Sequence, residues 1–362
     1  MMNPGFEIQL IAIIVSVSCA LPGVFLVLRK MSMMSDSITH TLLLGIVLAF
    51  FLANNMSSPL LIVGAALTGV ATVWLTEMLV KTRLVAEDSA TGVVFPLLFS
   101  IAVILITRYA GNIHIDTDAV LLGELAFAPF DRLIIVGVDI GARTIYTSGA
   151  LLLINILLIA VFFKELGLAA FDPMLAAVLG FSPAIIHYGL MTLVSVTAVG
   201  AFEAVGSILV VAFMVAPPAT AYLLTDDLKT MLIFSACFAM LSAVFGCRLA
   251  VWLDVSIAGS IAITGGLIFA LALCLAPKRG LAAAVLRRAM ARRKFEKHTL
   301  LLHICKNPDT PFSEVSRFLH RDVKNRVLNA LLREDKIELR SGHISATQRG
   351  IDSIEEFMQN IR

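Results

Sequence analysis

Nine long runs of apolar residues constrain the fold of this chain more than any other feature of its sequence. Each run holds about 17–25 residues, the length that an α-helix needs to cross the hydrocarbon core of a bilayer. Of the 362 residues, 59% are hydrophobic and only 15% are charged, which is unlike a soluble domain. We therefore predict an all-α polytopic membrane protein with eight or nine transmembrane helices. The predicted spans are 8–28, 37–54, 59–80, 89–108, 146–163, 184–201, 203–224, 230–251 and 256–276.

Two parts of this pattern leave alternatives open. Stretch 119–145 is amphipathic, so it forms either a loop with an interfacial helix or one more short span. The spans on either side of Glu203 form two helices or one broken helix. Gly200 and Gly206 would permit a break that exposes backbone carbonyls.

Basic residues predict the orientation, because cytoplasmic loops of membrane proteins are enriched in Lys and Arg. Most basic residues before the tail fall in alternate connections, at Arg29, Lys30, Lys81, Arg83, Lys164 and Lys229. The pattern predicts an extracytoplasmic N-terminus and a cytoplasmic C-terminus. Arg108, Arg132 and Arg143 run against it, within long or acidic connections.

Charge divides the chain near Pro277. Residues 1–277 hold 10 Lys and Arg against 16 Asp and Glu, whereas residues 278–362 hold 18 against 10. We predict a transmembrane domain over 1–277, a basic juxtamembrane linker over 278–297 and a cytoplasmic domain over 298–362. The linker has eight basic residues and one acidic residue, which indicates contact with anionic lipid heads.

The cytoplasmic domain resembles a small α+β winged-helix domain in the order of its predicted elements. The predicted helices cover 299–305, 313–319, 322–333 and 351–361, and two short strands flank Ser341 and Gly342. Residues 298–362 hold 10 basic and 9 acidic residues, so contact with protein is favoured over DNA. Arg321, Lys324 and Arg326 keep nucleic acid open as a partner of the third helix.

Asp36 and His40 are the leading candidates for metal ligands. Their four-residue spacing places a carboxylate and an imidazole on one helix face, as half of a divalent metal site. Ionisable groups within a span usually face a pore or a polar partner. The alternative is that Asp36 caps a helix and His40 lies near the headgroups. Glu203 is a third candidate, or else a structural residue bonded to a neighbouring helix.

Residues 171–180 read as a short capped helix. Asp172 suits the N-cap, Pro173 the first helical position and Gly180 the C-terminal stop. This helix either lies on the membrane surface or docks a cytoplasmic partner.

Other polar groups give weaker signals. His114, Asp116 and Asp118 read as solvated residues of an outward loop, with contact to a metal-delivering protein as the alternative. We expect His187 to anchor the membrane interface rather than bind metal. No P-loop motif is present, so the chain is not expected to bind ATP by that motif.

Four blocks of sequence, 23–40, 87–92, 171–180 and 203–221, resemble the permease subunits of bacterial ATP-binding-cassette importers for zinc and manganese. The resemblance covers residues ~5–277. Ser35, Thr39 and Leu44 depart from the residues common in that family, where Gly, Ser and Pro are frequent. None of these departures removes a candidate ligand.

The resemblance implies a multi-pass protein of the bacterial inner membrane that transports a divalent metal, manganese first and zinc or iron as alternatives. It implies a metal path through Asp36 and His40, with Glu203 as a further candidate. It also implies contact with an ATPase through the helix defined by Phe171, Asp172, Pro173, Ala176 and Gly180.

The resemblance further implies three partners: a cytoplasmic ATPase, an extracytoplasmic metal-binding protein, and a second copy of the permease or a related one. The chain itself would be a transport subunit and not an enzyme, with no permanent cofactor. A membrane-tethered metal sensor whose output is the winged-helix domain is the alternative from another class.

Overall fold

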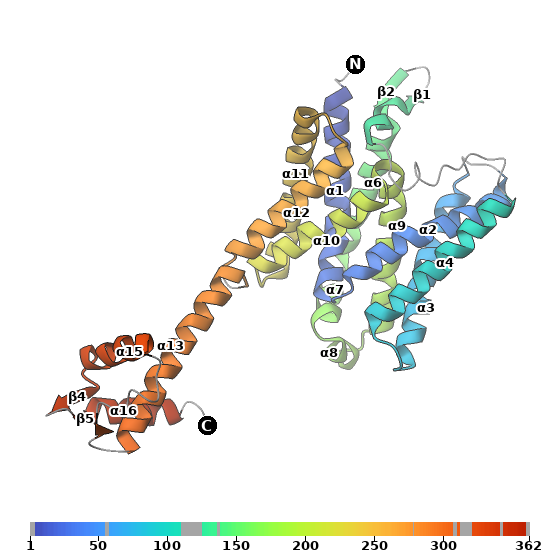
Figure 1. The fold of residues 1–362 in the computed structure, drawn as a ribbon. Helices are drawn as coiled ribbons and strands as arrows, with labels where there is room; N and C mark the ends of the chain where they lie inside the picture. Colours follow the sequence, from blue (N-terminus) through green and yellow to red (C-terminus); the bar gives the residue numbers. More distant parts are fainter. Residues whose placement is uncertain are drawn as a thin grey trace. The chain divides into compact units, whose positions relative to one another are not determined.

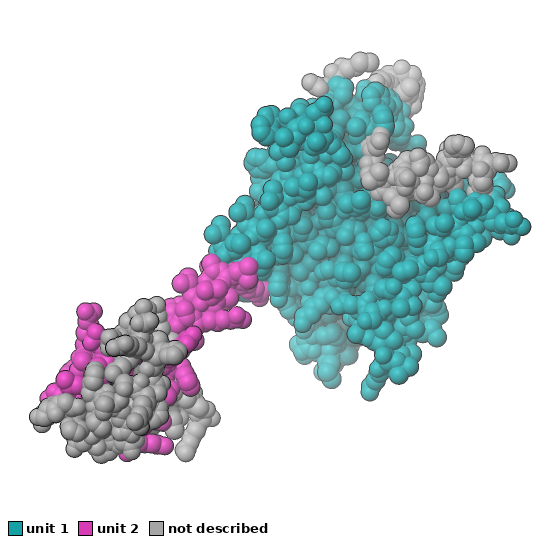
Figure 2. Space-filling model, in the orientation of Figure 1, with its two compact units in different colours: residues 1–276 teal, residues 277–362 magenta. Residues whose placement is uncertain are grey.

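The structure is a computed structural model, and it describes residues 4–54, 58–109, 125–135, 138–277, 279–306, 310–311, 321–340 and 343–359. The chain divides into two compact units, residues 1–276 and residues 277–362, which Figure 2 shows in different colours. The division lies at Pro277, where the charge balance of the sequence changes. Each unit is described by itself.

The first unit is a bundle of helices. Among its described residues, nine helices are long and apolar enough to cross a membrane. Each coincides with a predicted span, and the ends differ by five residues at most. In Figure 1 they are α1 (Pro4–Leu28), α2 (Ser32–Ala53), α3 (Leu60–Lys81), α4 (Glu87–Tyr109), α6 (Arg143–Val161), α9 (Pro183–Val205), α10 (Ser207–Leu224), α11 (Leu228–Leu253) and α12 (Ile257–Leu275). Large apolar side chains such as Leu67, Trp74 and Ile104 are exposed, as lipid-facing residues would be.

Between α4 and α6 the described residues form a short 3-10 helix, η1 (Leu125–Phe130), and an antiparallel hairpin of β1 (Arg132–Ile135) and β2 (Val138–Ala142). The described part of stretch 119–145 is therefore a connection and not another span. Arg132 lies 3.2 Å from the buried carboxylate of Glu7, which ties the hairpin to the start of α1. The residues His114, Asp116 and Asp118 lie outside the described ranges.

Two short helices, α7 (Phe163–Phe171) and α8 (Pro173–Val178), join α6 to α9. The predicted capping of α8 is confirmed: Asp172 Oδ1 accepts a hydrogen bond from the backbone N–H of Leu175 at 2.9 Å, and Pro173 begins the helix. Gly180 follows with a φ of +89°, a conformation that favours glycine. Figure 1 shows α7 and α8 at one end of the bundle.

Helices α2 and α3 approach each other closely because both carry glycine at the crossing. A Cβ atom on Gly45 would lie 2.3 Å from the carbonyl oxygen of Gly64, and one on Gly64 would lie 2.7 Å from the carbonyl oxygen of Gly45. Small residues allow this approach in membrane helices, where dispersion replaces the hydrophobic effect as the force that drives association.

A buried polar network joins α1, α6 and α9. Asn155 of α6 donates to the carbonyl and hydroxyl oxygens of Ser18 at 2.9 Å each and accepts from the hydroxyl of Thr197 at 3.0 Å. All three side chains are fully buried. Such interhelical bonds contribute about 0.6–2 kcal/mol each within a membrane.

The break between α9 and α10 lies at Gly206 and not at Gly200. Gly206 has a φ of +78° and a ψ of 169°, a region open essentially to glycine alone. The two apolar runs around Glu203 are thus two helices, and Glu203 lies in the last turn of α9.

The second unit contains α13 (Leu281–Lys306), β3 (Thr310–Pro311), α15 (Arg321–Arg333), β4 (Ile337–Arg340), β5 (His343–Ala346) and α16 (Gln348–Gln359). Its strands form an antiparallel sheet in the order β3-β5-β4. The core brings together Leu301 of α13, Leu331 of α15, Ile337 of β4 and Ile344 of β5. The unit is therefore a small α+β fold.

Within the second unit the predicted linker and the predicted helix 299–305 are one continuous helix, α13. A boundary at residue 298 would divide this helix just before Leu300 and Leu301, which are buried in the core. The predicted helix 313–319 and the turn at Ser341 and Gly342 lie outside the described residues.

Replacing Gly64 by Ala is expected to lower the melting temperature of the purified protein. The new Cβ would lie 2.7 Å from both the carbonyl oxygen of Gly45 and the Cβ of Ala49. Overpacking of this kind costs about 1–3 kcal/mol. Gly149→Ala in α6 is the control, because its added Cβ would meet no atom within 4 Å. Equal thermal unfolding of the two variants in detergent would contradict the close α2–α3 contact.

Candidate functional site

One side of α2, which we call its open side, carries both leading candidates with their side chains half-buried. Helix α2 begins at Ser32, so Asp36 lies in its second turn and His40 one turn further along. Its N-cap is Met31, which makes no side-chain cap. The alternative in which Asp36 caps the helix is therefore wrong, and the pair lies within a membrane-length helix.

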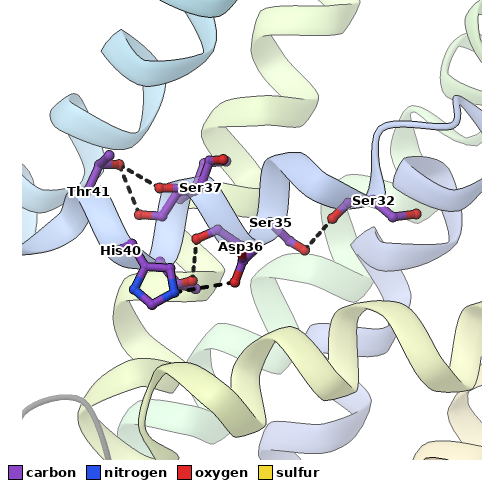
Figure 3. Close-up of polar contacts among 8 residues, drawn as sticks. Ser32, Ser35, Asp36, Ser37, His40 and Thr41 are labelled. Atoms are coloured by element: carbon purple, nitrogen blue, oxygen red, sulfur yellow. Dashed lines mark hydrogen bonds and ion pairs between the residues drawn. The ribbon is translucent and has the colours of Figure 1, made fainter. Parts of the chain in front are cut away.

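Asp36 and His40 point to the same side of α2 and reach each other, as Figure 3 shows. His40 Nε2 lies 3.4 Å from Asp36 Oδ1, and the two side chains are 31% and 36% exposed. Their neighbours Ser35, Ser37 and Thr39 are buried in the bundle. The helix thus leaves one carboxylate and one imidazole partly exposed on the same side.

Two aromatic rings of α4 hold the imidazole of His40. The ring of Phe95 stacks against it at a centroid distance of 5.7 Å, and the ring of Phe99 meets it edge-on at 6.2 Å. These contacts were not anticipated from the sequence. The four-residue spacing of Phe95 and Phe99 shows that both rings share a helix face, but spacing alone does not show which helix they meet.

The opposite side of α2 is anchored to α3. The hydroxyl of Thr72 donates to the hydroxyl of Thr41 at 2.8 Å, and both residues are fully buried. Thr41 also donates to the carbonyl of Ser37 at 3.0 Å. Because α2 is fixed on this side, it cannot rotate freely about its axis, and Asp36 and His40 remain on the open side.

Glu203 stands apart from this pair. Its side chain is exposed, and among the described residues its carboxylate has no hydrogen bond or ion pair. The alternative of a structural Glu bonded to a neighbouring helix is therefore wrong. Across the described ranges, no three His, Cys, Asp or Glu side chains come close enough to hold a metal together. Glu203 is thus not a third ligand beside Asp36 and His40 in a single chain.

The position of His187 differs from the sequence-based expectation of an anchor at the membrane interface. It is buried in the first turns of α9, at 6% exposure, and its Nε2 faces Oε1 of Glu77 on α3 at 2.5 Å. An imidazole that anchors the interface would have its ring open to the headgroups. The expectation of an interfacial anchor is therefore corrected.

Helix α8 presents a largely open apolar surface. Phe171, Met174 and Val178 are exposed, whereas Ala176 is fully buried against the rest of the bundle. An exposed apolar surface of this kind at the end of a bundle is typical of an interaction site.

A half-buried ionisable pair on a membrane-length helix, combined with an exposed apolar helix at one end of the bundle, suits a membrane transport subunit. Comparison with known proteins makes this specific. Residues 5–276 match the model of the ABC 3 transport family, and the chain belongs to that family.

Individual relatives span most of the chain. The zinc transport system membrane protein TroD of Treponema pallidum is 48% identical over 298 residues, which cover 82% of this chain and 81% of TroD. The manganese transport system membrane protein MntD of Bacillus subtilis is 44% identical and is covered over 96% of its length, against 78% of this chain. The solved structure of PsaBC from Streptococcus pneumoniae in complex with Fab superposes with a TM-score of 0.64 at 27% identity, over 77% of this chain and 94% of the matched chain.

Proposed function

We propose that this chain is the permease subunit of an ATP-driven importer of divalent metal ions, with manganese as the main candidate and zinc or iron as alternatives. The pair of Asp36 and His40 on the open side of α2 is the observation that carries the proposal. Carboxylate and imidazole suit all three metals, and neither residue supplies the soft thiolate that would favour copper. Relatives named for zinc and for manganese transport support the same class of substrate.

Asp36 and His40 of one chain offer the ion two of the four to six ligands that these metals take. The open side of α2 lets a second copy, or a related permease, approach with its own pair. Ligands from both chains and retained water would then complete the coordination. A site built in this way binds weakly until the two chains close on it, which suits an ion that must also leave.

Helix α8 and its flanks are the proposed contact with a separate ATPase. The set consists of Phe171, Asp172, Pro173, Ala176 and Gly180. Its exposed apolar side chains would enter a groove of the ATPase, and its capped, rigid form would transmit motion to the bundle. This role places α8 and the C-terminus in the cytoplasm, and the metal-delivering protein at the opposite end of the bundle.

The second unit is proposed as a winged-helix-like regulatory module. The described order of α13, β3, α15, β4, β5 and α16 fits that fold. Arg287, Arg288 and Arg292 of α13 are exposed, which supports contact with anionic lipid heads. The structure does not describe the side chains of Arg321, Lys324 and Arg326. Contact with protein is favoured because residues 298–362 hold nearly equal numbers of basic and acidic residues.

Asp36→Ala and His40→Ala are each expected to abolish metal uptake while leaving the complex assembled, because both side chains are only half-buried and neither belongs to the buried core of the bundle. Uptake of Mn²⁺ into proteoliposomes that contain the permease and its ATPase is the measurement. Met33→Ala is the control, since Met33 is exposed near the pair but has no ligand chemistry for a hard ion. Normal uptake by both ligand variants would show that the pair is not on the transport path.

Glu203→Gln keeps the shape of the side chain but removes its charge. It is expected to reduce Mn²⁺ uptake less than Asp36→Ala or His40→Ala does.

Asp172→Ala should weaken coupling between ATP hydrolysis and uptake. The substitution removes the side-chain cap of α8, which costs about 1 kcal/mol of helix stability. Asp227→Ala is a matched control, because Asp227 caps α11 through Thr230 with the same 2.9 Å geometry. The ratio of metal transported to ATP hydrolysed is the measurement. An unchanged ratio in Asp172→Ala would argue against α8 as the coupling element.

Deletion of residues 281–362 is expected to leave uptake intact and to remove its dependence on metal supply. The cut precedes α13, so no half-helix with an exposed core face remains. Uptake by cells grown with low and high manganese is the measurement. Loss of uptake in an assembled truncated complex would make the second unit part of the transport machinery instead.

A further inference from the structure

A second polar cluster lies at the end of the bundle that carries α8. It lines a cavity of about 430 Å³ between α3, the start of α9, the start of α4 and the turn from α1 to α2. Its polar side chains are Arg29, Glu77, Lys81, Glu87, His187 and Tyr188. None of them belongs to the pair on the open side of α2.

His187 is the group in this cluster that needs an explanation. Its ring is buried, lines the cavity, and has no hydrogen-bond partner at Nδ1 among the described residues. Its Nε2 pairs with Oε1 of Glu77 at 2.5 Å, so Nδ1 is the ring nitrogen that lacks a partner. Buried polar atoms are nearly always paired, and one that is not often marks the place of an ion or ligand.

Glu77 is held in a fixed orientation beside this imidazole. Its other oxygen, Oε2, accepts a hydrogen bond from the hydroxyl of Tyr188 at 2.6 Å. A carboxylate oriented by an outer hydrogen bond, next to an imidazole nitrogen, is the usual arrangement of protein ligands around a divalent metal. The cavity has room for water to complete the coordination.

We propose that Glu77 and His187 form a second site for a divalent transition-metal ion, through which the ion leaves toward the cytoplasm. The direction of travel rests on the proposed function, whereas binding of the ion does not. The two protein ligands would bind the ion with water, and the exposed residue Glu87 lines the same cavity.

The positively charged side chains of Arg29 and Lys81 would make binding of the ion at this site weak and readily reversible. Arg29 interacts electrostatically with both Glu77 and Glu87, and Lys81 Nζ lies 3.9 Å from Glu77 Oε2. These positive charges partly neutralise the carboxylates before any metal arrives. They therefore lower the affinity for a divalent ion, and an ion that does bind exchanges readily with the solvent.

The test is Mn²⁺ binding to the full chain, purified with its ATPase and followed by EPR titration. In an Asp36→Ala/His40→Ala background we expect one Mn²⁺ per chain to remain. Adding Glu77→Gln or His187→Gln should weaken that binding by about tenfold or more, as expected for a lost ligand. Glu77→Gln keeps the acceptor for Tyr188, so it serves where His187→Gln fails to fold.

Lys81→Gln in the same background separates a metal site from a purely structural ion pair. Removing this exposed charge should tighten Mn²⁺ binding by about two- to fivefold, because one repulsion at short range is lost. If Glu77 and His187 only joined α3 to α9, Lys81→Gln would leave Mn²⁺ binding unchanged.

The proposal is overturned if the Asp36→Ala/His40→Ala protein binds no Mn²⁺, or if its binding is unchanged by both Glu77→Gln and His187→Gln. Failure of the proposed function has a different signature. Asp36→Ala/His40→Ala would then bind Mn²⁺ and transport it as the unmodified protein does, whatever the substitutions at Glu77 and His187 do.

Discussion

The close contact of α2 with α3 is the constraint on which the candidate site depends. Within a bilayer, two helices gain nothing from the hydrophobic effect when they meet, so close packing and hydrogen bonds must hold them. Gly45 and Gly64 let the backbones approach, and the Thr41–Thr72 bond fixes the rotation of α2 about its axis. That rotation decides that Asp36 and His40 face outward. A carboxylate within an apolar bundle would otherwise be expelled or neutralised.

The spans were predictable because the length of an apolar run depends only on neighbouring residues in the sequence. All nine predicted spans agree with described helices. The capping of α8 was predictable for the same reason, since Asp172 and Pro173 act within one turn. Contacts between distant segments were not. Glu77 and His187 are 110 positions apart in the sequence, and no periodicity brings α3 and α9 together. The placement of His40 between Phe95 and Phe99 was hidden for the same reason.

The two polar sites differ in how the surrounding charges treat an ion. Beside His40 stand the aromatic rings of Phe95 and Phe99, which carry no positive charge. Beside Glu77 and His187 stand Arg29 and Lys81, whose positive charges repel a cation and compensate the carboxylates in its place. On the proposed path, an ion that moved from the first environment to the second would reach a place where water competes better for it.

Gly206 separates α9 and α10 into two helices that are joined by a single non-helical residue. A continuous helix of that length would bend as one piece, whereas a residue at φ +78° and ψ 169° interrupts the ladder of backbone hydrogen bonds. On one side of the joint, α9 packs against α3 and carries His187 near its far end. On the other side, α10 packs against α1 and α12. A small change in angle at this one residue would therefore be magnified along the length of α9, and its effect would be largest at the far end, where His187 lines the cavity beside Glu77.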